Sequence, residues 1–84
     1  MAVPSQPITL SSEQLEDLDR KLSTMRHDIN NYLSLIMAAA ELIRHKPELT
    51  ERMMATLVEQ PKRITDALIK FSAEFDHTLG ISRR

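Results

Sequence analysis

The chain has 84 residues, with 11 Lys and Arg side chains, 12 Asp and Glu side chains and a formal net charge of -1. A chain of this length forms one small domain at most and buries too little apolar surface to be comfortably stable alone. Because it contains no cysteine, disulfides and thiolate metal sites are excluded, which leaves oligomerisation as the source of further stability. The balance of charges argues against a basic, nucleic-acid-binding face.

No segment of the sequence is expected to enter a membrane. The longest apolar run, residues 35–40, is far shorter than the roughly 20 residues of a spanning helix, and the amino terminus has no apolar signal segment. We therefore expect a cytoplasmic protein that binds neither nucleic acid nor membrane. With one glycine, one tyrosine and two phenylalanines, the composition is typical of an all-α protein.

The amino-terminal residues 1–11 contain two prolines and no apolar periodicity, so we expect a flexible arm. Ser11 or Ser12 should cap the helix that follows. Ser11 has Gln14 three residues later, and acidic residues that suit the positive end of a helix dipole follow Ser12.

The first helix is expected over about residues 12–45. The basic residues before Pro47 predict its end, because cations favour a helix carboxyl terminus and the residue before proline avoids helical geometry. Apolar residues recur along it at spacings of three and four, which indicates one apolar seam. The seam residues are Leu15, Leu18, Leu22, Met25, Ile29, Tyr32, Ile36 and Ile43, with Leu33 beside them.

A second helix is expected over about residues 48–79, starting either with Pro47 in its first turn or at a Thr50 cap. Pro61 cannot donate a backbone hydrogen bond, yet the apolar register continues across it, so we predict one helix kinked near Pro61 in preference to two helices. Gly80 is a natural stop, followed by a tail over 81–84. The seam residues are Met54, Leu57, Pro61, Ile64, Leu68, Phe71, Phe75 and then Thr78 or Leu79.

A short hairpin with an apolar seam on each arm leaves one side of its core uncovered. Pairing two hairpins about a two-fold axis covers both seams. We therefore predict an antiparallel helical hairpin over residues 12–80 that forms an obligate homodimer, a four-helix bundle. The residues expected in the dimer core are Leu22, Met25, Ile29, Ile36, Leu57, Ile64, Leu68 and Phe71.

The first helix also carries a polar stripe away from its seam. Residues three, four and seven apart share a helix face. The residues of this polar face are Arg20, Ser23, Thr24, His27, Asn30, Asn31 and Ser34. His27 is thus expected in solvent, followed directly by the acid Asp28 and four residues later by the amide Asn31. The simplest alternative is an ordinary surface histidine without a role.

Residues 26–36, Arg-His-Asp-Ile-Asn-Asn-Tyr-Leu-Ser-Leu-Ile, resemble the phosphoacceptor box of the dimerisation and histidine phosphotransfer domain of sensor histidine kinases. That box reads His, an acid, two variable residues, and then Asn or Thr. It lies midway along the first of two helices whose hairpins dimerise as a four-helix bundle, so the resemblance covers about residues 12–80. Tyr32 departs from it, since many members have a proline there that bends the helix.

The resemblance implies that His27 accepts a phosphoryl group, that Asp28 is its acid-base neighbour and that Asn31 helps to place water when a partner's aspartyl phosphate is hydrolysed. The implied partners are a response-regulator receiver domain and a separate kinase ATP-binding domain. The chain has no ATP-binding sequence and hence no autonomous kinase activity. We expect no cofactor and no metal. Residues that border the site and are expected to contact phosphate or partner are Ser23, Thr24, Asn30 and Ser34.

Other functions stay open at this point. The chain is also consistent with a homodimeric helical interaction module that scaffolds or sequesters a regulator, in which His27 is incidental, or with a receiver phosphatase that depends on Asn31. It is equally consistent with a stand-alone protein and with a piece of a larger kinase. His45 and His77 are expected to be ordinary surface residues, because they have no metal-ligand spacing to each other or to His27.

Overall fold

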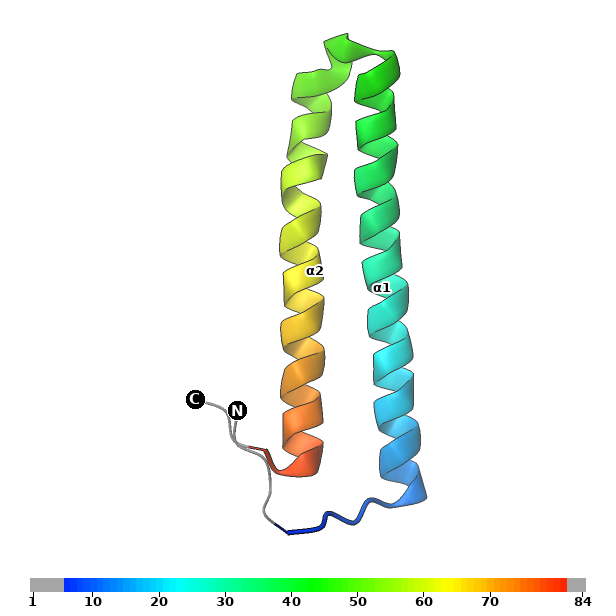
Figure 1. The fold of residues 1–84 in the computed structure, drawn as a ribbon, viewed down its shortest axis with the longest axis vertical. Helices are drawn as coiled ribbons and strands as arrows, with labels where there is room; N and C mark the ends of the chain where they lie inside the picture. The colour runs from blue at the N-terminus through cyan, green and yellow to red at the C-terminus, as the bar shows by residue number, and fades with distance from the viewer. Residues whose placement is uncertain (1–5, 82–84) are drawn as a thin grey trace.

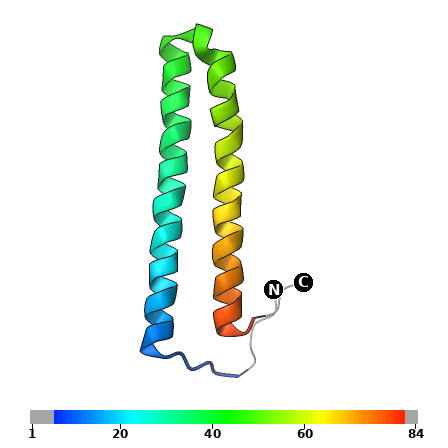
Figure 2. The ribbon, with the colours of Figure 1, turned by 180° about the vertical axis from the view of Figure 1, so that it is seen from behind.

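The structure is a computed structural model that describes residues 6–81. It contains two long helices, α1 (Ser12–His45) and α2 (Thr50–Leu79), joined by the 3-10 turn η1 (Pro47–Leu49). The helices lie side by side and antiparallel in a hairpin 58 Å long (Figures 1 and 2). The predicted all-α hairpin is confirmed. Parts of the predicted arm and tail, residues 1–5 and 82–84, lie outside the described residues.

A capping box starts α1. The Ser11 hydroxyl accepts a hydrogen bond from the Gln14 backbone N–H at 3.1 Å, and Gln14 Oε1 accepts one from the Ser11 N–H at 2.8 Å. Each bond satisfies a backbone donor that has no partner within the helix. Of the two serines proposed as the cap, the structure therefore selects Ser11, and Ser12 is the first helical residue.

The connection between the helices is a tight turn. The Lys46 N–H closes α1 by donating to the Leu42 carbonyl at 2.7 Å. Pro47 then begins η1, where its fixed φ suits the first position and its missing N–H costs nothing. The Thr50 hydroxyl donates to the Pro47 carbonyl at 2.6 Å. The α-helix thus begins at Thr50, two residues after position 48, because the residues before it take the narrower 3-10 geometry. Of the two starts left open, neither is exact: Pro47 opens the 3-10 turn, and Thr50 is the first helical residue, with Leu49 as the cap.

Helix α2 is continuous across Pro61, so of the two alternatives for this segment the structure has the single helix. The Leu57 carbonyl has lost the N–H that an ordinary residue at position 61 would donate; the predicted kink stays a prediction. The helix ends at Gly80, whose φ of +67° lies in the left-handed region. The Ile81 N–H donates to the Asp76 carbonyl at 2.8 Å across this glycine.

The hairpin covers only part of its apolar surface. Among residues 6–81, only Ala39 and Gln60 are buried. Seven of the eight residues predicted for a dimer core are partly buried in the single chain, whereas Leu68 is 46% exposed. Two helices pack along one line of contact, so each keeps apolar side chains beside that line that the other cannot reach.

Part of the uncovered apolar surface lies on one side of the hairpin. Leu15, Pro61 and Leu68 are exposed, and each precedes by three positions a partly buried seam residue of its own helix. Seen along the hairpin axis, the chain turns clockwise in one antiparallel helix and anticlockwise in the other. Residues three positions before a seam residue therefore lie on the same side of the hairpin in both helices. We call this surface the open face; its residues are Leu15, Leu33, Met54, Pro61 and Leu68.

Replacing Pro61 with alanine restores a donor for the Leu57 carbonyl. Proline within a helix is about 3 kcal/mol less favourable than alanine. Because α2 already accommodates the proline ring, the substitution gains only part of this difference. We expect Pro61→Ala to raise the free energy of unfolding by about 1–2 kcal/mol, measured by urea unfolding at fixed protein concentration. Lys62→Ala, at the next exposed position, is the control; a less stable Pro61→Ala protein contradicts this account of α2.

Candidate functional site

His27 lies near the middle of α1, and its side chain is 76% exposed. Its position follows from the helix period. Met25 faces α2 and is partly buried, and a residue two positions later is rotated by roughly 200° from it. His27 therefore points away from α2 and away from the open face, as the polar stripe predicts.

Two neighbouring side chains approach the same nitrogen of the His27 ring. Asp28 Oδ1 lies 3.9 Å from Nδ1, and Asn31 Nδ2 lies 3.5 Å from it. Asn31 reaches the ring because side chains on a helix lean toward its amino terminus and residues four apart share a face. Within the described residues, Nε2 has no hydrogen-bond partner. The structure thus brings together the three residues predicted to do chemistry and leaves one ring nitrogen open to solvent.

The four residues predicted to border the site all lie on the surface of α1: Ser23, Thr24, Asn30 and Ser34. Thr24 lines a groove together with Asp28. No hydrogen bond joins any of the four to His27 within the described chain. They form exposed polar surface around the histidine and do not constrain it.

A groove of about 250 Å³ runs between the helices beside Asp28. Its apolar lining comes from Met25 on α1 and from Ala67 and Phe71 on α2. Lys70 also lines the groove and has no ion-pair partner among the described residues. The polar stripe on α1 did not predict that residues of α2 line this groove. The sequence of one helix does not show which residues of the other helix lie beside it.

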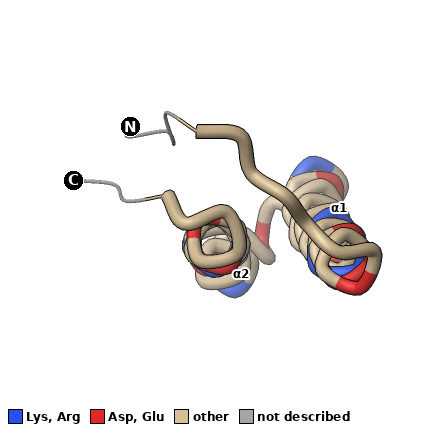
Figure 3. The backbone as a smooth tube through the Cα atoms, turned by 90° about the horizontal axis from the view of Figure 1, so that it is seen from below, with Lys and Arg blue, Asp and Glu red and all other residues tan. Residues whose placement is uncertain are grey.

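Ion pairs link the two helices at the end of the groove that is nearer the amino terminus of α1. Lys21 Nζ lies 2.8 Å from Asp17 Oδ2 and 3.8 Å from Glu74 Oε2, so it links α1 to α2. Arg20 also pairs with Asp17. The hydrogen bond from Lys21 lowers the pKa of Asp17, and the same bond raises the pKa of Lys21. Charges of both signs occur along each helix in the end-on view (Figure 3).

Tyr32 stands where the resembling family often has proline, and α1 continues through it without a break. The residue is partly buried. Arg63 of α2 lies near enough to interact with it, and the pKa of Arg63 is raised by the carboxylate of Glu59 and, to a smaller extent, by Tyr32. The helix is therefore uninterrupted after the candidate site.

No family model, curated protein or solved structure matches the chain. Neither α1 nor α2 contains a stretch that is both long and apolar enough to cross a bilayer. Between residues 6 and 81, no group of three or more His, Asp or Glu side chains is arranged to hold a metal ion.

The depressed pKa of Asp17 makes part of the stability depend on pH. An acid with a folded pKa below its unfolded value, here 3.8, stabilises the fold above the unfolded pKa, and this contribution is lost as the pH falls through the folded pKa. We expect Asp17→Asn to flatten the loss of stability below about pH 4. Urea unfolding between about pH 5 and pH 2 measures this, with Asp19→Asn as control; equal acid sensitivity of both variants contradicts it.

Proposed function

We propose that the protein is a histidine phosphotransfer module of a two-component signalling pathway, in which His27 accepts a phosphoryl group and passes it on. The observation that carries this proposal is the exposed imidazole, approached at Nδ1 by two side chains and open at Nε2. A neutral imidazole is nucleophilic near neutral pH. Its place on a long regular helix lets a partner domain bring phosphorus into line with the free nitrogen.

The neighbours of His27 fit the roles that the resemblance implies. As Nε2 attacks phosphorus, positive charge develops on the ring, and the Asp28 carboxylate 3.9 Å from Nδ1 stabilises it. Asn31 both donates and accepts hydrogen bonds. Its amide lies on the Nδ1 side of the ring, as the carboxylate of Asp28 does, and is suited to orient water against a receiver's aspartyl phosphate.

The open face supports a homodimer as the working form. It presents exposed Leu15, Met54 and Leu68 on one side of a hairpin in which, between residues 6 and 81, only Ala39 is a buried apolar residue. A second copy that packs its own open face against this one would cover the exposed apolar side chains of both copies and complete a four-helix bundle. His27 points away from this face, so dimerisation leaves it accessible.

A receiver domain would dock on the other side, beside His27. By helical spacing, Leu35 and Leu42 share a side of α1 with Asn31, and both are exposed. Leu35 and Leu42 lie between His27 and the turn that joins the helices. The groove beside Asp28 extends from the histidine toward the amino-terminal end of α1. Both surfaces are small, as a transient signalling contact requires.

Transfer of a labelled phosphoryl group tests the proposal. A panel of receiver domains, each phosphorylated with labelled acetyl phosphate, is mixed with the protein, and acid-labile label on the protein is measured. We expect at least one receiver to label the wild type, and His27→Ala to abolish the label because the nucleophile is gone.

His77→Ala is the matched control for this experiment. His77 is also exposed and helical, so its loss should leave labelling unchanged. Equal labelling of wild type and His27→Ala contradicts the assignment of His27. Absence of label from every receiver, and from ATP-binding domains supplied with labelled ATP, contradicts the proposed function.

A charge on the open face tests the homodimer. Leu68→Asp would place a carboxylate where a second copy should cover an apolar side chain, which costs several kcal/mol when the charge is left unpaired. We expect light scattering at low micromolar concentration to report a dimer for the wild type and a monomer or unfolded chain for Leu68→Asp. Ala73→Asp, on an exposed position away from the open face, should stay dimeric; a folded monomeric wild type contradicts the proposal.

The exposed apolar side chains of the open face also favour a second candidate function, a non-catalytic interaction module that binds a regulator through its helices. The two differ in what they require of His27. An interaction module keeps its binding after His27→Ala and loses it after Leu68→Asp, whereas a phosphotransfer protein loses labelling in the first variant. A receiver phosphatase would instead depend on Asn31.

A further inference from the structure

We propose that the groove between α1 and α2 beside Asp28 binds a free amino acid with an apolar side chain. Asp28 pairs with the ammonium group of this ligand, Lys70 pairs with its carboxylate, and the apolar side chain lies on the floor of the groove. This binding does not depend on the proposed role of His27. It follows from the lining, in which two opposite charges stand beside one apolar surface.

The floor of the groove is apolar and comes from both helices. Met25 belongs to α1, whereas Ala67 and Phe71 belong to α2. The Phe71 ring packs against the ring of Phe75 at a centroid distance of 6.0 Å, which lies within the range of favourable aromatic pairs. An apolar side chain that lies on this floor is removed from water, and the hydrophobic effect therefore favours its binding.

Two charges of opposite sign line the groove from opposite helices and do not pair with each other. Between residues 6 and 81, Lys70 of α2 has no ion-pair partner, and Asp28 of α1 approaches only the His27 ring, at 3.9 Å. A free amino acid carries an ammonium group and a carboxylate on one carbon, so each of its charges meets an opposite charge here. The Thr24 hydroxyl, which can donate and accept, lines the same groove.

The other charges around the groove already balance one another. Lys21 Nζ lies 2.8 Å from Asp17 Oδ2 and 3.8 Å from Glu74 Oε2, and Arg20 pairs with Asp17. Two cations and two carboxylates thus neutralise each other at this end of the groove. The two charges left unpaired sum to zero, so a zwitterion matches the groove better than an anion or a cation does.

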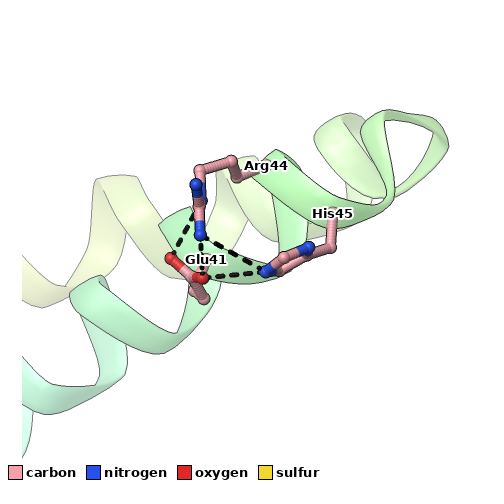
Figure 4. Close-up of polar contacts among 3 residues, drawn as sticks. All are labelled: Glu41, Arg44 and His45. Atoms are coloured by element: carbon pink, nitrogen blue, oxygen red, sulfur yellow. Dashed lines mark hydrogen bonds and ion pairs between the residues drawn. The ribbon is translucent and has the colours of Figure 1, made fainter.

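The charged cluster near the turn is arranged differently, because it is paired within one helix. Glu41 accepts a hydrogen bond from Arg44 at 2.8 Å, and its Oε1 lies 2.9 Å from His45 Nε2 (Figure 4). The pKa of Glu41 is lowered by Arg44 and by His45, so this group stays a carboxylate with two partners. No charge of this cluster needs a ligand to balance it.

The groove suits a small ligand in size and in access. Its volume of about 250 Å³ lies just below the range of drug-sized sites, about 300–1,000 Å³. Asp28 and Lys70 each follow a partly buried residue of their own helix by three positions, whereas the open-face residues precede one by three. The groove therefore lies on the side away from the open face, and the proposed dimer leaves it accessible.

Methyl NMR on the full chain measures the binding of three matched probes: L-phenylalanine, 3-phenylpropionate, which lacks the ammonium group, and phenethylamine, which lacks the carboxylate. We expect each probe to shift the methyl signals of Met25, Thr24 and Ala67, because these residues line the groove, and to leave that of Met54 unshifted. L-Phenylalanine should bind about threefold more tightly than either other probe, the factor that one exposed ion pair supplies.

Substitutions at the two charged residues assign each contact. Lys70→Gln should lower the affinity for L-phenylalanine to the value for phenethylamine, because the carboxylate loses its partner. Asp28→Asn should lower it to the value for 3-phenylpropionate. Lys62→Gln, at an exposed lysine outside the groove, should leave all three affinities unchanged. L-Phenylalanine should also shift the ring signals of His27 in the wild type, because Asp28 lies 3.9 Å from Nδ1.

Equal affinities of the wild type for the three probes, or an unchanged affinity for L-phenylalanine after Lys70→Gln, overturn the inference. Shifts confined to Met54, or the absence of saturable binding, overturn it as well, because the probe then lies on the open face or does not bind. No receiver or ATP-binding domain enters this experiment. Its outcome is therefore separate from the label-transfer test of the proposed function, and either result can fail while the other stands.

Discussion

The architecture depends on the packing of two long helices along a single line of contact. A pair of helices covers one row of side chains on each, and the apolar seams of this chain are wider than one row. Ala39 is buried, whereas Leu15 and Leu68 are about half exposed. The same helix period that turns the seam inward turns His27 outward. Stability and display of the imidazole are thus two consequences of one pattern.

Much of the fold could be predicted because its signals are local. The capping pair Ser11 and Gln14 and the left-handed Gly80 each act within a few residues, and the structure places them at helix ends. The seam is local in the same sense, because its spacing is set by the helix period. The start of the second helix was displaced by two residues, since the sequence does not show whether Pro47 opens an α-helix or a 3-10 turn.

The parts of the site that escaped prediction depend on contacts between helices or on rotamers. Lys70 and Ala67 join the groove beside Asp28 only because α2 lies at a particular height along α1. Gln60 is 5% exposed with its Oε1 unpaired, although its polar side chain stands outside the apolar repeat. The contact of Asn31 with Nδ1 was within reach of the spacing, whereas the atoms that meet follow from side-chain conformation.

The central claim is that one side of the hairpin is covered by a second copy while the opposite side presents His27. Solvent paramagnetic relaxation on the protein at working concentration tests both halves at once, because a soluble paramagnetic agent broadens only the signals it can reach. The account predicts protected methyl groups at Leu15, Met54 and Leu68 together with a broadened His27 ring. A protected His27 ring, or methyl groups on the open face that broaden as strongly as those of Leu35 and Leu42, would contradict it.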